Sequence, residues 1–319
     1  DGIPAATMPI AVRSTTGDIP DDLHIATRRD AGSWQIDNLT ALEISDLTVE
    51  VEGLVAGEQD HETVPQDSDN GDVFDDYTDG TFLKLVDIPA GATNFISEVL
   101  VSESPDLDLF MGYDLNNDGI PTPNELGCVS ASGTALESCE FANPPAGQWW
   151  VLVQNWAASA PDANDAFTLS TAVLDGSDAG NMTIDGPSNV GQLEPFSLRV
   201  FFDEDMNVGE RYYGSFSLGT DAGNAGNLGS VAVRLDRHED DVHKAASTDL
   251  AMPGDTVSYE ITILPNVMNE DLTYDLTDTI PEGMTYVEGS VTGGATVTDG
   301  VLSWNGVLQS PFLAAGSYV

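Results

Sequence analysis

The chain has few positive charges. Its 319 residues include 9 Lys and Arg against 54 Asp and Glu, which gives a formal net charge of −45. A protein that binds nucleic acid or anionic lipid needs basic groups to replace the counterions of the phosphates, so the composition excludes both classes of partner. Hydrophobic residues nevertheless make up 41% of the chain. We therefore expect folded domains with acidic surfaces that keep the protein soluble in salt water and attract divalent cations.

Long apolar runs and helical periodicity are also missing. No stretch reaches the roughly 18 apolar residues of a transmembrane helix, so no membrane span is expected. Short alternating patterns separated by Gly, Pro, Asn and Asp recur instead. This is typical of β-sandwiches in series, and the predicted fold class is all-β with tandem β-sandwich domains.

Cysteine is scarce, and its placement is informative. Cys128 and Cys139 lie in a turn-rich stretch, and a disulfide between them would contribute about 3 kcal/mol on the chain-entropy model. A reactive or metal-binding pair is the weaker alternative, because the spacing is not Cys-x-x-Cys and no histidine lies nearby. The disulfide predicts an oxidising compartment outside the cytoplasm, so the protein is expected to be secreted or on the cell surface.

Catalytic motifs are absent from the sequence. No Gly-x-Ser-x-Gly elbow and no Gly-Thr-Ser-Met-Ala context occurs around any serine. His238 and His243 lie five positions apart, a spacing that would not place both on the helix face of a zinc protease motif. No glycine-rich phosphate loop with a lysine is present either. We predict that this chain has no catalytic residues and is not itself an enzyme.

The strand patterns divide the chain into four segments and one linker. The segments are residues 1–58, 81–175, 176–239 and 240–319, with an acidic linker at 59–80. Both the first and the last segment look incomplete, so we expect a piece of a longer protein. Five aspartates of the linker, at 67, 69, 72, 75 and 76, would offer a second calcium site, but no glutamate stands at the closing position and a flexible linker is favoured.

Segment 81–175 has the strongest strand patterns. Leu107, Leu109 and Met111 should share one strand face, as should Phe95, Val99 and Val101 on the preceding strand. The strand at 149–156 is apolar on both faces and is predicted to lie in the middle of a sheet. Its tryptophans would form either a sugar-stacking platform or part of the core. The core is favoured for at least one of Trp149 and Trp150.

Residues 114–125 fit the calcium-loop pattern Asp-x-(Asp/Asn)-x-(Asp/Asn)-Gly-x5-Glu. Ca²⁺ takes about six to eight oxygen ligands. The predicted ligands are the side chains of Asp114, Asn116 and Asp118, the carbonyl of Ile120, Thr122 directly or through water, and both oxygens of Glu125. Pro121 removes an amide that paired calcium sensors use, so the loop would be a single structural site. The alternative is an Asx-rich surface turn. Asp106 and Asp108 share a strand face and would either add ligands or lie on a solvated face.

Segment 81–175 resembles the bacterial pre-peptidase C-terminal domain, a jelly-roll-like β-sandwich that follows the catalytic domain of secreted proteases. The matching pieces occur in the family's order. They are a strand that ends in Pro89-Ala90-Gly91, the Asp106-Leu107-Asp108-Leu109 strand, and the Ala146-Gly147 turn that enters the aromatic-rich strand. This resemblance covers about a third of the chain.

The flanking segments show further resemblances. Residues 245–305 are similar to an immunoglobulin-like repeat of extracellular bacterial proteins, through the motifs at 253–259 and 278–283. Residues 7–54 and 196–235 resemble fibronectin type III-like modules that trail subtilisin-like proteases, through 8–12 and 212–214.

Together, the resemblances imply the non-catalytic accessory region of a secreted bacterial subtilisin-like serine endopeptidase. Its catalytic domain would lie upstream in the same chain, and the region would act in spacing, in export or in engaging protein substrate. Calcium is the implied structural cofactor. The alternative is a cell-surface adhesin or carbohydrate-binding module with no protease attached, whose partner would be polysaccharide or other surface material.

Overall fold

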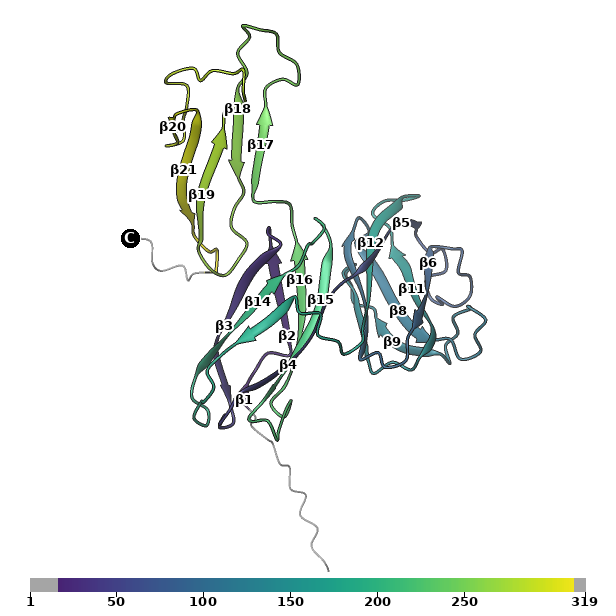
Figure 1. Cartoon of the computed structure of the whole chain (residues 1–319). Coiled ribbons are helices and arrows are strands. Elements are labelled where there is room, and N and C mark those ends of the chain that lie inside the picture. Colours follow the sequence, from purple (N-terminus) through teal and green to yellow (C-terminus); the bar gives the residue numbers. More distant parts are fainter. Residues whose placement is uncertain (1–16, 313–319) are drawn as a thin grey trace, which may run out of the picture.

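The computed structural model describes residues 17–312, and every regular element within this range is a β-strand (Figure 1). The predicted all-β class is confirmed. The described residues form three units. We call them the host sandwich (17–56 with 178–237), the inserted sandwich (58–174) and the third unit (242–312). None of the described residues forms a helix that is long and apolar enough to cross a membrane.

The host sandwich consists of two four-stranded sheets, with strand orders β1-β3-β14-β13 and β2-β16-β15-β4. Its strands are β1 (Gly17–Asp18), β2 (Asp22–Thr27), β3 (Ala31–Ala41), β4 (Thr48–Ala56), β13 (Met182–Asp185), β14 (Phe196–Asp203), β15 (Arg211–Gly219) and β16 (Gly229–Arg237). Alternate side chains of both sheets point inward. Ile25, Val200 and Phe216 are almost completely buried in the core between the sheets.

The two segments expected as separate fibronectin type III-like modules are strand partners in this one sandwich. β3 pairs with β14, β4 with β15, and β2 lies parallel to β16. Each segment alone supplies only half of each sheet and could not bury its apolar faces. The boundaries expected at residues 58 and 176 are therefore the entry to and exit from an insertion. The motif at 8–12 lies outside the described residues.

The inserted sandwich also has two four-stranded sheets, ordered β10-β7-β12-β5 and β6-β11-β8-β9. Its strands are β5 (Glu58–Pro65), β6 (Thr81–Ile88), β7 (Asn94–Ser102), β8 (Asp106–Tyr113), β9 (Leu126–Ser130), β10 (Ser138–Ala142), β11 (Gly147–Ala157) and β12 (Asn164–Leu174). β11 lies between β6 and β8, as predicted from its two apolar faces. Leu107, Leu109 and Met111 are fully buried on one face of β8, also as predicted.

Aromatic rings and a disulfide fill the core of the inserted sandwich. The ring of Trp149 lies 4.8 Å from that of Phe141 and 5.7 Å from that of Phe95, centroid to centroid. Cys128 and Cys139 form the predicted disulfide, with 5.9 Å between their Cα atoms. Because β9 and β10 belong to different sheets, this bond joins the two layers of the sandwich covalently.

The expected linker at 59–80 is part of the inserted sandwich. Residues 58–65 form β5, which pairs with β12 along its length. The remainder covers the outer face of β11, where the ring of Phe74 packs edge-on against Trp150 at 6.1 Å. Asp67 is buried and accepts a 2.6 Å hydrogen bond from Nε2 of Gln154. A sheet that is apolar on both faces needs a cover on each, and this acidic segment provides one of them.

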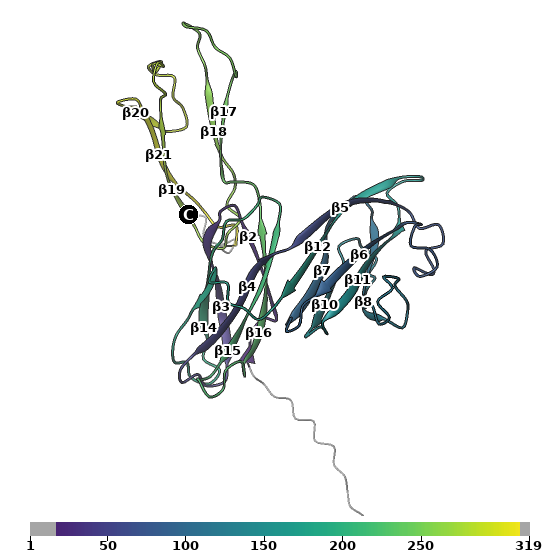
Figure 2. The same ribbon diagram turned by 45° about the vertical axis from the view of Figure 1, so that its right-hand side comes forward.

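The third unit contains a two-stranded and a three-stranded sheet, which Figure 2 shows beyond one end of the host sandwich. Its strands are β17 (Val242–Ala246), β18 (Tyr259–Ile263), β19 (Leu272–Thr279), β20 (Thr296–Thr298) and β21 (Val301–Leu308). The buried hydrophobic side chains of this unit are Met268 and Tyr274, and Met268 packs into the core of the host sandwich. The two units are thus joined by apolar contact.

Ion pairs concentrate at the junctions between these units. Arg13 lies outside the described residues, and the other eight basic side chains each lie within 4.0 Å of a carboxylate. Arg211 and Arg234 of the host contact the inserted sandwich. Arg29 and Arg199 contact Asp241 and Glu270 at the third unit. The few cations therefore connect parts of the fold, and most carboxylates have no cationic partner.

We predict that the stability of the fold rises with ionic strength. The Debye length falls from about 10 Å at 0.1 M salt to about 3 Å at 1 M, which screens repulsion between exposed carboxylates more than attraction within buried pairs. Thermal unfolding followed by circular dichroism should show a melting temperature several degrees higher in molar KCl than in dilute buffer. An equal osmolarity of sucrose is the control for preferential exclusion. An unchanged or lower melting temperature in KCl would contradict the prediction.

Candidate functional site

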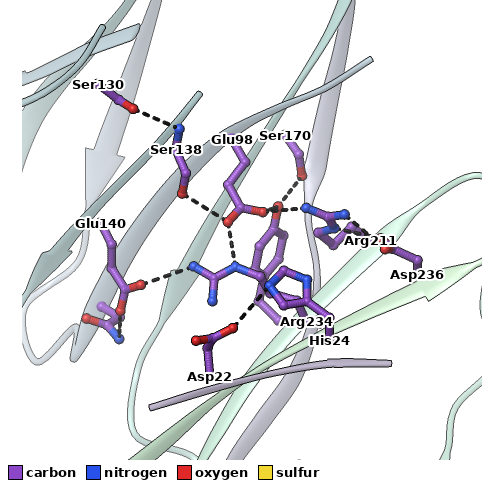
Figure 3. A network of polar contacts seen from close by, with 12 residues as sticks. Asp22, His24, Glu98, Ser130, Ser138, Glu140, Ser170, Arg211, Arg234 and Asp236 are labelled. Atoms are coloured by element: carbon purple, nitrogen blue, oxygen red, sulfur yellow. Dashed lines mark hydrogen bonds and ion pairs between the residues drawn. The ribbon is translucent and has the colours of Figure 1, made fainter. Parts of the chain in front are cut away.

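A groove of about 520 Å³ lies where the inserted sandwich meets the host sandwich, and charged side chains line it (Figure 3). We call it the junction groove. Its charged lining residues are Asp21, Asp22, His24, Glu98, Glu137, Glu140, Arg211 and Arg234. β7 and β10 of the inserted sandwich supply Glu98 and Glu140, and β2, β15 and β16 of the host supply Asp22, Arg211 and Arg234.

Glu98 is the centre of the polar contacts in Figure 3. Its Oε1 accepts hydrogen bonds from Nε of Arg234 at 2.5 Å and from the hydroxyl of Ser138 at 3.1 Å. Its Oε2 accepts from Arg211 at 2.8 Å and from the hydroxyl of Tyr213 at 3.0 Å. The side chain is 5% exposed. Four donors thus satisfy a buried carboxylate, and three of them belong to the host sandwich.

Apolar side chains surround this network. Ile96, Ala172 and Leu174 of the inserted sandwich pack around the fully buried ring of Tyr213, with Val55 of the host against them. The Tyr213 hydroxyl, whose proton goes to Glu98, accepts a hydrogen bond from the hydroxyl of Ser170 at 3.0 Å. These contacts bury most of the Glu98 side chain, and charge–charge interactions are stronger for a buried group than for a solvated one.

The electrostatics keep the network charged at neutral pH. Burial raises the pKa of Glu98, but the charges and hydrogen bonds of Arg234 and Arg211 outweigh it and hold the pKa below its usual range. Burial and the Glu98 charge raise the pKa of Tyr213, so its hydroxyl stays protonated. Arg211 also forms a two-pronged contact with Asp236, at 2.6 and 2.9 Å. Charges of opposite sign therefore alternate across the junction.

The four histidines of the chain lie at exposed positions. His24 lies 3.3 Å from Asp22, and both side chains are more than half exposed. Within residues 17–312, no histidine ring nitrogen forms a hydrogen bond to a serine hydroxyl; His61 contacts Thr168 at 3.0 Å, on an exposed surface. The contacts of the junction thus join the two sandwiches.

Glu98, Arg211 and Arg234 were not predicted from the sequence. A usable signal was present, since Glu98 stands between the apolar residues Phe95, Ile96 and Val99 in the buried stretch of β7. A charged residue in such a position requires a partner. With so few basic residues in the chain, the choice of partners was small, but their positions depend on a long-range contact.

We predict that Glu98→Gln destabilises the protein by about 3 kcal/mol at neutral pH, because it leaves two partly buried guanidinium groups short of a counter-charge. Denaturant unfolding followed by tryptophan fluorescence measures the change. Since the folded pKa of Glu98 is lowered, its stabilisation is present above the unfolded pKa, near 4.5, and is lost as the pH falls through the folded value. The difference between variant and wild type should therefore shrink in acid.

Glu62→Gln, on the exposed face of β5, is the matched control and should change stability by less than about 0.5 kcal/mol. Equal effects of the two substitutions would show that the junction network contributes nothing specific.

Three further carboxylates, Asp106, Asp108 and Glu137, lie close together at one edge of β8. Asp108 is 7% exposed, so this face of the strand is not the solvated one considered from the sequence. Glu137 accepts hydrogen bonds from the backbone of Ser132 at 2.9 Å and from neighbouring serine hydroxyls. Burial, then Asp106 and Glu137, raise the pKa of Asp108 to about 6.

We predict that Asp108→Asn stabilises the protein above pH 6 by about 1–2 kcal/mol, because the amide removes a partly desolvated negative charge. The folded pKa is raised, so the aspartate favours folding at low pH and loses that advantage as the pH rises through about 6. Denaturant unfolding of both proteins from pH 4 to 8 tests this. Parallel pH profiles, or a loss of stability at pH 8, would contradict it.

The predicted calcium loop is an exposed connection between β8 and β9. Asp114 and Glu125 are both buried, and their carboxylates accept backbone amides: Gly119 donates to Asp114 at 2.7 Å and Leu115 to Glu125 at 3.0 Å. The side-chain amide of Asn116 donates a hydrogen bond to the carboxylate of Asp118 at 2.9 Å. Ile120 is exposed, and the Thr122 amide donates to Glu125 at 3.1 Å.

This donor set is made of oxygens, which suits a hard cation, and neither Asp114 nor Glu125 has an ion pair with a basic residue of the described chain. However, no group of three or more His, Cys, Asp or Glu side chains between residues 17 and 312 is arranged to hold a metal ion. The hydrogen bonds described above close the loop by themselves.

Two of the three tryptophans considered as a sugar platform are core residues. Trp149 and Trp150 are 1% and 0% exposed, whereas Trp156 is 39% exposed. Trp156 lies at a register shift between β11 and β8, which directs it away from the core.

Comparison with known proteins assigns no family to the chain. No described protein family matches it, and no curated protein matches it. Among solved structures it is similar to Bacillus licheniformis lipase BlEst2 in propeptide form, with 12% identity, a TM-score of 0.22, and coverage of 57% of this chain and 41% of that chain. The chain thus spans less than half of that protein, and so low a TM-score carries no argument.

Proposed function

We propose that this chain is a non-catalytic, extracellular accessory region of a secreted subtilisin-like serine endopeptidase. The observation that carries the proposal is the junction around Glu98, which fixes the orientation of one sandwich on another with two arginines and an apolar contact. A fixed array of sandwiches suits a role in spacing. The disulfide is compatible with an extracellular protein. The protease assignment itself rests on the sequence resemblances.

The physical role would be to hold an attached catalytic domain at a defined distance from a surface or substrate. Domains joined by small, polar interfaces normally move relative to one another. Here the inserted sandwich contacts the host through buried ion pairs. The third unit contacts the host through Met268, the Trp34–Phe312 ring pair at 5.3 Å and the Arg199–Glu270 ion pair. These contacts support a rigid spacer rather than a chain of independent modules.

The coding sequence around this region tests the protease assignment. We expect the Asp, His and Ser motifs of a subtilisin-like domain upstream in the same reading frame, and no cleavage of casein by the purified chain. A complete reading frame without those motifs would overturn the assignment and favour the adhesin alternative. Cleavage of casein by a pure sample would overturn the non-catalytic role.

We further propose that calcium binds at residues 114–125 and stabilises the inserted sandwich. An ion that binds only the folded state adds RT ln(1 + [Ca²⁺]/Kd), so millimolar extracellular calcium suffices even for a weak site. Calorimetry should show a higher melting temperature with calcium than with EDTA, and Asp118→Ala should abolish the difference. The exposed Asp249→Ala is the control. Identical wild-type traces with calcium and EDTA would contradict calcium binding.

A further inference from the structure

A second groove, of about 540 Å³, lies on the outer face of the host sandwich beside the third unit. We call it the Phe201 groove. The side chains that matter for its chemistry are Ser33, Asn181, Thr183, Phe201, Asp203 and Glu270. They come from β3, β13 with the residues before it, and β14 of the host, and the third unit contributes Glu270 from the segment before β19.

Phe201 is an aromatic side chain without an aromatic partner. It points to the outer face of the sheet and is 39% exposed, whereas its neighbour Phe202 is buried in the core. Within the described part of the chain, no aromatic ring and no cation lies against it. Gly180, on the wall of the groove, has open space where a Cβ would stand. Phe201 is therefore partly exposed where it lines the groove.

The polar groups around this ring have hydrogen-bonding capacity to spare. The side chains of Thr183 and Asp203 form no hydrogen bond with any residue from 17 to 312. Each oxygen of Glu270 has one donor, Ser33 at 2.8 Å and Arg199 at 3.3 Å, and a carboxylate oxygen accepts more than one. Asn181 is held in place by the backbone of Leu54. Hydrogen bonds thus hold Glu270 and Asn181 in position, while the exposed side chains of Thr183 and Asp203 are free to bond a ligand.

An aromatic face surrounded by carboxylates and a hydroxyl matches the chemistry of a sugar ring. A pyranose presents C–H groups on its face, which pack on the negative face of an aromatic ring, and hydroxyls at its rim, which donate to carboxylates. The charges of Asp203 and Glu270, with a net charge of −45 on the chain, disfavour uronic or sulfated sugars. A peptide added at the edge of β13 would find only the four-residue strand Met182–Asp185 to pair with.

We propose that the Phe201 groove binds a neutral saccharide, with Phe201 as the stacking platform and Asp203, Thr183 and Glu270 as hydrogen-bonding groups. The inference goes beyond the accessory role, because the site needs only the host and the third unit and does not depend on an attached catalytic domain.

The experiment is isothermal titration of the full chain, in the salt that stabilises it, with cellohexaose, maltohexaose, chitohexaose and mannohexaose. Oligogalacturonate and hexalysine are the charged probes. We expect at least one neutral hexasaccharide to bind and oligogalacturonate not to bind. Phe201→Ala should weaken that binding at least about tenfold, the scale expected for losing one central aromatic contact.

Trp156→Ala is the matched control, because Trp156 has the same 39% exposure but lies on the inserted sandwich. It should leave the affinity unchanged. If Phe201→Ala fails to fold, as judged by its melting curve, Asp203→Asn and Thr183→Val carry the test and should each weaken binding several-fold.

Three results would overturn the proposal. The first is that no neutral hexasaccharide binds. The second is that Trp156→Ala, and not Phe201→Ala, removes the binding. The third is that only hexalysine binds, with an affinity insensitive to Phe201→Ala, which would make the groove an acidic peptide surface. None of these results changes the coding-sequence test of the protease assignment.

Discussion

The scarcity of cations is the constraint on which this architecture depends. A chain with 54 carboxylates repels itself, and 9 basic residues cannot neutralise its surface. The described basic residues lie instead where sheets and units meet, each against a carboxylate. Glu98 shows the result most clearly, because two of the seven arginines converge on it from the host sandwich. Attraction is concentrated at a few buried contacts, while repulsion is spread over the exposed surface.

This distribution has consequences for how the units behave. Buried pairs are screened less by salt than exposed charges. The contacts that hold the sandwiches together therefore persist under ionic conditions that relieve repulsion between their surfaces. A buried ion pair often stabilises the fold no more than well-packed hydrophobic residues in its place would, but its geometry is specific. At this junction, Ile96, Leu174 and Tyr213 supply the apolar contact, and the Glu98 network fixes the register in which they meet.

Local features of the fold could be predicted from the sequence, and long-range ones could not. The period-two patterns at Leu107 and Leu109, the central position of β11 and the disulfide each depend on near neighbours. Val101 was expected beside Phe95 and Val99 in the core but is 62% exposed. A register shift between β7 and β12 near this position turns the strand. The pairing of β3 with β14 joins residues more than 150 positions apart. The residue pattern of neither strand indicates which other strand it pairs with.

The same distinction applies to the sites. The spacing of acidic residues at 114–125 is local and can be read from the sequence, and calcium binding there stays a prediction. The junction and Phe201 grooves combine residues from three or more strands, and only the fold brings these together. The acidic composition of residues 66–80 suggested a solvated linker, because the segment has few large apolar residues. Phe74 and Val73 are nevertheless enough to cover Trp150.

The insertion also determines how mechanical load would travel through the molecule. The chain leaves the host after β4 and returns before β13, and the two crossings are adjacent: the Gly53 amide donates to the Ser177 carbonyl at 3.0 Å. Tension applied between residues 17 and 312 would pass through the host and the third unit. While the host stays folded, the inserted sandwich lies beside this path and carries no load; once the host unfolds, the same tension passes through the insertion, because the insertion joins the two halves of the host chain.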